Sequence, residues 1–113
     1  MIENRGKDGI ILTDFYTLID KNEKRFCVQL AKKTHPIFQA HFPNNPIVPG
    51  FILLDMSAEI LGIEILKIQK AKFLKNIPPF SVLWFDIQTN AKTLKIRVSQ
   101  NEEKVAELTY EKR

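Results

Sequence analysis

Residues 41–55 read HFPNNPIVPGFILLD and join a proline-rich loop to a long apolar segment. The prolines at 43, 46 and 49 fix φ and remove three backbone donors, so residues 43–49 cannot form ordinary helix or central strand. Pro49 suits the first turn of a helix, and Gly50 lets another group approach the backbone closely. The pattern therefore predicts a rigid loop followed by a helix that begins near Gly50 and runs to about residue 68.

Two side chains in this stretch are able to move protons. His41 precedes the loop, and histidine exchanges protons near neutral pH. Asp55 lies one turn inside the apolar segment, where a carboxylate is costly unless it is paired, hydrogen-bonded or protonated. Either the two form a catalytic pair, or His41 is a loop histidine and Asp55 borders the core.

The predicted helix is apolar on most of its circumference, which indicates burial on several sides. A sheet is therefore expected to wrap it. Asp55 and Glu59 are four residues apart and share a face, whereas Ser57 points elsewhere. Gly62 is expected to permit the close approach of a strand.

The rest of the chain favours strands. Segments rich in β-branched residues or with alternating apolar residues predict strands over 10–19, 25–30, 80–87, 93–99 and 105–110. The first two strands are expected to form a hairpin, and residues 37–39 one helical turn. Such an order indicates an α+β domain in which an antiparallel sheet packs on one helix. A single domain is expected over 1–113, with residues 1–8 flexible. Cys27 and His35 are interpreted as structural and surface residues.

Composition narrows the class of protein. The chain has 113 residues, of which 44% are apolar and 27% charged, as in globular domains. The single cysteine excludes an internal disulfide and fits a reducing cytoplasm, and the polar start does not resemble an export signal. Charges inside 51–68 argue against membrane insertion. The net charge of +4 comes without the Arg-rich or aromatic pattern of nucleic-acid binding.

The pattern His-Phe-Pro-x-x-Pro-x-x-Pro-Gly, with a carboxylate fourteen positions after the histidine, resembles the active-site signature of the β-hydroxyacyl-[acyl carrier protein] dehydratases. These enzymes are members of the hotdog-fold superfamily, in which a sheet curls around a central helix. Weaker similarity continues to about Lys72-Phe73. The resemblance implies the same fold, and a homodimer, either alone or assembled into a higher oligomer, whose sites lie between the subunits.

The resemblance also implies a mechanism without metal or organic cofactor. His41 would take the proton at C2 of a 3-hydroxyacyl thioester, and Asp55, from the opposite subunit, would protonate or orient the leaving hydroxyl. The N–H of Gly50 or a neighbour would stabilise charge on the thioester oxygen. The product would be the trans-2-enoyl thioester of fatty acid, polyene or polyketide synthesis.

Two residues depart from the family pattern. Asn44 replaces the usual glycine, and it tolerates a positive φ. Glu59 stands where the family often has glutamine, and a second carboxylate so close should raise the pKa of one of the pair if both are buried. Glu59 is therefore a possible modulator of Asp55, or a sign of altered chemistry.

A basic cluster is predicted just beyond the helix, and it would suit an acidic acyl carrier protein or be a solvated helix end. The cluster consists of Lys67, Lys70, Lys72 and Lys75. Two other functions remain open: a hotdog acyl-thioesterase, which shares the fold but is not expected to keep the signature, and a non-catalytic acyl-binding protein, which keeps the loop without the chemistry.

Overall fold

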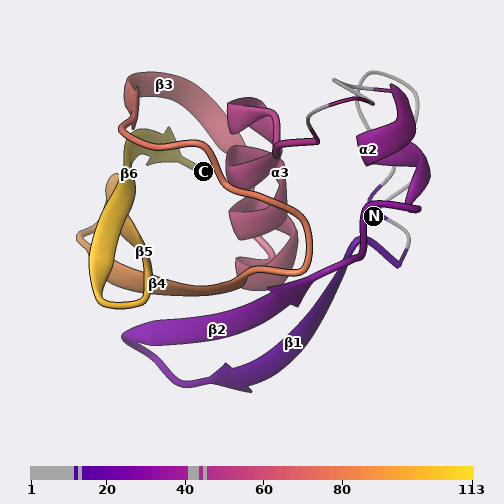
Figure 1. The fold of residues 1–113 in the computed structure, drawn as a ribbon. Helices are drawn as coiled ribbons and strands as arrows, with labels where there is room; N and C mark the ends of the chain where they lie inside the picture. Colours follow the sequence, from indigo (N-terminus) through magenta and orange to yellow (C-terminus); the bar gives the residue numbers. More distant parts are fainter. Residues whose placement is uncertain (1–11, 13, 41–43, 45) are drawn as a thin grey trace.

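A six-stranded antiparallel sheet curls around one helix in the computed structural model, which describes residues 12, 14–40, 44 and 46–113 (Figure 1). The sheet order is β1-β2-β4-β5-β6-β3. The elements are β1 (Tyr16–Lys21), β2 (Arg25–Leu30), α2 (Pro36–Ala40), α3 (Gly50–Leu61), β3 (Ile65–Phe73), β4 (Val82–Thr89), β5 (Thr93–Gln100) and β6 (Glu103–Lys112). The predicted α+β hotdog architecture is confirmed.

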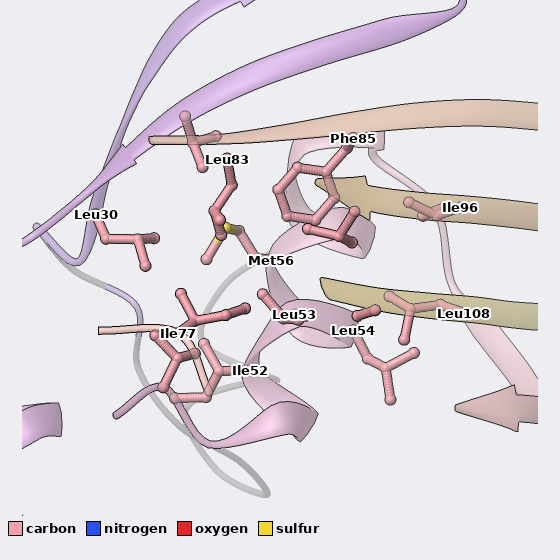
Figure 2. Close-up of a cluster of buried hydrophobic side chains, with 14 of the residues drawn as sticks. Leu30, Ile52, Leu53, Leu54, Met56, Ile77, Leu83, Phe85, Ile96 and Leu108 are labelled. Carbon is pink, nitrogen blue, oxygen red and sulfur yellow. The ribbon is translucent and has the colours of Figure 1, made fainter. Parts of the chain in front are cut away.

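The core lies between α3 and the concave face of the sheet. Ile52, Leu53 and Met56 of the helix are fully buried, and Figure 2 shows Met56 beside Leu83 of β4 and Ile52 beside Ile77. Residues 52–54 and 56–58 are all buried, so the helix is enclosed on most of its circumference rather than packed by one stripe, as its sequence predicts. The sheet thereby holds α3, and every residue on it, in one orientation.

The helix is shorter than predicted. It ends at Leu61, not near residue 68, because Gly62 adopts the left-handed conformation with φ 65° and its N–H bonds to the carbonyls of Ala58 and Glu59. A Cβ at Gly62 would meet nothing within 4 Å. The expected close approach of a strand at Gly62 is therefore wrong, and this glycine is a helix cap.

The segment after the cap is the edge strand β3, whose first residues, 65–68, were predicted as helix. Irregularities between Ile65 and Lys67 and between Ile68 and Lys70 interrupt its pairing with β6. These β-bulges set Ile68, Ala71 and Phe73 opposite the buried β6 residues, and leave the lysines between them opposite Glu107, Thr109 and Glu111. Because of the bulges, the sequence of β3 lacks the strict alternation of apolar and polar residues that would identify a strand.

The smaller predictions hold in part. The first hairpin forms, although β1 begins at Tyr16; the expected start at 10 and the flexible residues 1–8 lie outside the described residues. The predicted helical turn is α2. His35 is not a simple surface residue, since its Nδ1 accepts a hydrogen bond from Ile37 at 3.1 Å and its ring lies edge-on to Phe15. Cys27 is buried at 2% exposure.

In the described segments, α3 has 12 residues, fewer than the roughly 20 that cross a bilayer, and no helix there meets the requirements of a membrane span.

Candidate active site

The start of α3 presents backbone donors. Pro49 precedes the first turn in an extended conformation, with φ −60° and ψ 131°, and among the described residues no side chain caps this end. The first turns of a helix carry N–H groups without helical partners and the positive end of the helix dipole. The Ile52 N–H bonds to the Pro49 carbonyl at 3.0 Å. This end of α3 is therefore suited to stabilise negative charge on an oxygen atom.

Gly50 lies at this helix start because a side chain would not fit. The ring of Phe73, from β3, lies 2.7 Å from the position that a Cβ would occupy. The expected close approach at Gly50 is confirmed, and the approaching group is an aromatic ring that remains 46% exposed. One side of the helix start is consequently apolar and open.

Asp55 lies on α3 between the buried residues Leu54 and Met56, and is itself half-buried. The helix thus presents the carboxylate at the margin of the core and about one turn beyond Gly50. His41 lies outside the described residues, as do Phe42, Pro43 and Asn45.

The remainder of the proline loop is anchored to the strand connection across from it. The Val48 N–H bonds to the Ile77 carbonyl at 2.8 Å, and both side chains are buried. Asn44, which departs from the family pattern, lies in an exposed turn. The Val48 contact holds the chain at the entrance to α3 and so supports the orientation of the helix start.

Glu59 accepts a hydrogen bond from the phenol of Tyr16, which lies at the start of β1. Burial is the largest cause that raises the pKa of Tyr16, and the hydrogen bond and charge of Glu59 raise it further. Tyr16 is therefore a donor at any physiological pH. Sequence patterns did not single out Tyr16, because 43 residues separate it from Glu59.

The opposite side of the helix is tied to the sheet by neutral groups. The Ser57 hydroxyl donates to the Leu54 carbonyl at 2.8 Å and lies 3.2 Å from the hydroxyl of Tyr110 on β6. Ser57 and Tyr110 are both fully buried. As predicted, Ser57 points away from Asp55 and Glu59, and its contacts belong to the core.

The basic cluster lies beyond α3, as predicted, but on the strand β3 and just after it, so it is not a helix end. Its members are exposed, but Lys70 pairs with Glu107 at 3.5 Å and Lys75 pairs with Glu103. The local positive charge is therefore smaller than the sequence indicates.

A depression of about 470 Å³ lies on the outer face of the sheet. Side chains of both charges line it, including Lys70, Asp86, Arg97 and Glu107. Its lining contains neither Asp55 nor Gly50, and the Lys70–Glu107 pair belongs to it. The depression is therefore separate from the candidate active site around α3.

Comparison with known proteins agrees with this geometry. A 3-hydroxyacyl-[acyl-carrier-protein] dehydratase FabZ of Thermoanaerobacter sp. is 32% identical over 78 residues, which cover 63% of this chain and 55% of that protein. The corresponding enzyme of Enterococcus faecalis is 33% identical over 96 residues, which cover 74% of this chain and 65% of that protein. The chain thus spans between half and two thirds of the length of these relatives.

Solved structures share the fold. The dehydratase heterocomplex ApeI:P from Xenorhabdus doucetiae superposes with a TM-score of 0.67 at 21% identity, over 85% of this chain and 93% of that one. A mutant thioesterase PA1618 from Pseudomonas aeruginosa gives a TM-score of 0.56 at 14% identity, over 98% and 90% of the two chains. Dehydratases and thioesterases thus share this architecture, and fold alone does not choose between them.

The comparison with family models distinguishes between dehydratases and thioesterases. Residues 18–109, from β1 to β6, match the ApeI-like family, described as ApeI dehydratase. This match covers the proline loop, α3 and all six strands except the ends of β1 and β6. The chain therefore belongs to the ApeI-like dehydratase family.

Proposed function

We propose that this protein dehydrates a 3-hydroxyacyl thioester carried on acyl carrier protein to the trans-2-enoyl thioester. The observation that carries the proposal is the position of Asp55, half-buried and one turn inside a helix whose start at Gly50 has no side-chain cap among the described residues. The signature that precedes this helix and the membership of the family support the same chemistry. Fatty acid, polyene and polyketide synthesis all use such a step.

Each group has one role in the proposed reaction. His41 removes the proton at C2, and negative charge develops on the thioester oxygen. The N–H of Gly50 or its neighbour donates to that oxygen, where a fixed donor is most effective. Asp55 gives its proton to the hydroxyl at C3 as the C3–O bond breaks, so that water leaves and the C2–C3 double bond forms.

We propose a homodimer that pairs through β3. This strand is one edge of the sheet, and its residues Leu66, Ile68 and Phe73 are between 46% and 50% exposed. An exposed apolar edge strand is a template for pairing with another chain, and two copies of one edge form a closed, two-fold interface. Because Phe73 also contacts the position of Gly50, such pairing would bring the second copy beside the start of α3.

The carrier protein is the proposed partner of the exposed lysines on the outer side of β3. Lys67 and Lys72 lie opposite Glu111 and Glu107 in the strand register, on the face away from the core. They would meet an acidic carrier at the rim of the dimer, where charges mainly raise the association rate. A reducing cytoplasm, which suits the single buried Cys27, is the proposed location.

Product analysis tests the function directly. A 3-hydroxyacyl carrier protein is incubated with the enzyme, and the acyl products are separated by mass. An enoyl thioester is expected, and a loss of 18 mass units distinguishes it. A free acid would instead identify a thioesterase, and binding without turnover would identify an acyl-binding protein.

Subunit mixing tests the roles of the pair. His41→Ala and Asp55→Ala should each lower turnover about a hundredfold or more, with a smaller effect on binding. If each site takes one residue from each subunit, a heterodimer of the two mutants contains one intact site and one doubly mutated site. Activity should therefore return on exchange, whereas heterodimers that form without recovery would contradict the shared site.

A further inference from the structure

Resting on the proposed function, we infer that Phe80 and the neighbouring Lys32 and Lys33 form a surface on which an acidic acyl carrier protein docks. These three residues are called the Phe80 patch below. Phe80 is an exposed aromatic side chain that an unfavourable backbone conformation holds outward. The patch supplies the apolar anchor of the docking surface, whereas Lys67 and Lys72 supply charge.

Phe80 adopts a backbone conformation that suits glycine. Pro79 and Phe80 are the central residues of a turn, and the φ of Phe80 is 64°. A positive φ at the second central position is usual for glycine and unusual for a bulky residue, because the Cβ then crowds the following carbonyl. Such strain persists only where the surrounding structure fixes it, and it gathers at functional sites. The conformation therefore indicates a role for this ring.

Hydrogen bonds on both sides hold the turn. The Phe80 N–H donates to the Ala31 carbonyl at 2.8 Å, and the Phe80 carbonyl accepts from the Gln29 side chain at 3.3 Å. The Ser81 carbonyl accepts the Leu30 N–H at 2.9 Å. The Phe80 side chain nevertheless stays 54% exposed. The bonds thus fix the ring in place without burying it.

The Phe80 patch is positively charged. The Lys32 ammonium lies 5.6 Å from the centroid of the Phe80 ring, and Lys32 and Lys33 are both exposed. Among the described residues neither lysine forms an ion pair with a carboxylate, in contrast to Lys70 and Lys75. An aromatic anchor beside two cations fits a partner whose apolar surface is bordered by carboxylates. A second copy of this chain fits poorly, because a two-fold interface would bring two sets of the same lysines together.

The Phe80 patch lies close to the start of α3. The Ile77 carbonyl accepts the Val48 N–H at 2.8 Å, and Val48 lies two residues before Gly50. Phe80 follows Ile77 by three residues, a length of chain that spans at most about 10 Å. A carrier docked on the patch would therefore bring its thioester to the helix start, where the Gly50 N–H is the proposed donor.

Binding of a fluorescently labelled acyl carrier protein to the whole protein tests the ring of Phe80. Phe80→Gly and Phe80→Ala both remove the ring, and each should raise the Kd about tenfold. The glycine variant should unfold about 4 °C or more above the alanine variant, since only glycine adopts a positive φ without strain. Equal losses of affinity in two variants of unequal stability would show that the ring binds the carrier.

Charge reversal tests the two lysines. Lys32→Glu combined with Lys33→Glu should raise the Kd more at low salt than at high salt. Lys24→Glu combined with Lys92→Glu is the matched control, because it makes the same change in net charge at exposed residues of two other turns. This control should leave the Kd nearly unchanged, and an equal rise in both double variants would contradict a local contact.

Ile19→Ala is the matched control for the ring, because Ile19 is also 54% exposed but lies on β1. It should leave the Kd unchanged, and no variant should alter KM for a small thioester. An unchanged Kd in Phe80→Gly would overturn the inference, even if that variant loses self-association or binding to anionic vesicles. Carrier binding is measured without turnover, so the proposed function stands or fails separately in the product analysis.

Discussion

Replacement of Gly50 by alanine should destabilise the protein only while Phe73 is present. The new Cβ would lie 2.7 Å from the Phe73 ring, and ordinary carbon contacts require about 3.5–4 Å, so the ring must retreat by roughly 1 Å. Phe73 is 46% exposed, and full burial of phenylalanine contributes about 1.5–3 kcal/mol, so losing this contact costs about 1–1.5 kcal/mol.

The same substitution also stabilises, because alanine loses less chain entropy on folding than glycine. That gain is about 0.4–1 kcal/mol where the backbone conformation is compatible, and Gly50 has no positive φ. The net effect of Gly50→Ala in the wild type is therefore a loss of about 0.5 kcal/mol. In a Phe73→Ala background the contact is absent, and the same change becomes a gain of about 0.4–1 kcal/mol.

Urea unfolding of the wild type, Gly50→Ala, Phe73→Ala and the double variant measures this sign change. All four are compared at one protein concentration, because the stability of a dimer depends on concentration. The expected coupling energy is about 1–1.5 kcal/mol. Gly62→Ala is the control: its φ of 65° penalises alanine by about 1–2 kcal/mol, and no atom lies within 4 Å of the new Cβ. A Gly50→Ala effect of equal sign and size in both backgrounds would refute the proposed steric contact.

Three other changes test separate parts of the molecule. Ile68→Lys should weaken the dimer, and light scattering at micromolar concentration checks it; an unchanged dimer would remove β3 from the interface. Charge reversal at Lys67 and Lys72 should raise KM for a carrier-bound substrate in a salt-dependent way, but not for a small thioester, while Lys24→Glu should leave both unchanged; equal effects on both substrates would contradict recruitment. Burial raises the pKa of Tyr110 above 10.0, so its contribution to stability is complete below pH 10 and declines as the pH rises toward the folded-state pKa. Tyr110→Phe should therefore unfold less steeply with pH above 10 in alkaline melts, and an identical slope would contradict this.

The beginning of the central helix was predictable from sequence, but its end was not. Pro49 and Gly50 mark a helix start through their own backbone chemistry, which tertiary structure does not change. The apolar segment continues past Gly62, and glycine inside such a segment is compatible with a helix interior. The bulges in β3 then removed the alternation that would have identified a strand, so residues 65–68 read as more helix.

The site was predictable where it depends on local spacing. Asp55 and Glu59 share a helix face because of a four-residue interval, and this needs no tertiary information. Tyr16 and Phe73 reach α3 only because β1 and β3 are folded against it, and neither residue has a local signal. The register of a strand decides which of its side chains face the helix, and a single sequence does not specify the register when bulges interrupt the pairing.

The position of β6 between β5 and β3 has a consequence for how the chain folds. β3 directly follows α3, yet its partner in the sheet is β6, which is made after every other strand. During synthesis the apolar helix therefore stays incompletely enclosed until about fifty further residues, up to the end of β6, have been added. We expect slow closure and a period of chaperone dependence, since exposed apolar surface favours aggregation. Pulsed hydrogen exchange during refolding should find β3 amides protected no earlier than those of β6, and earlier protection of β3 would contradict this order.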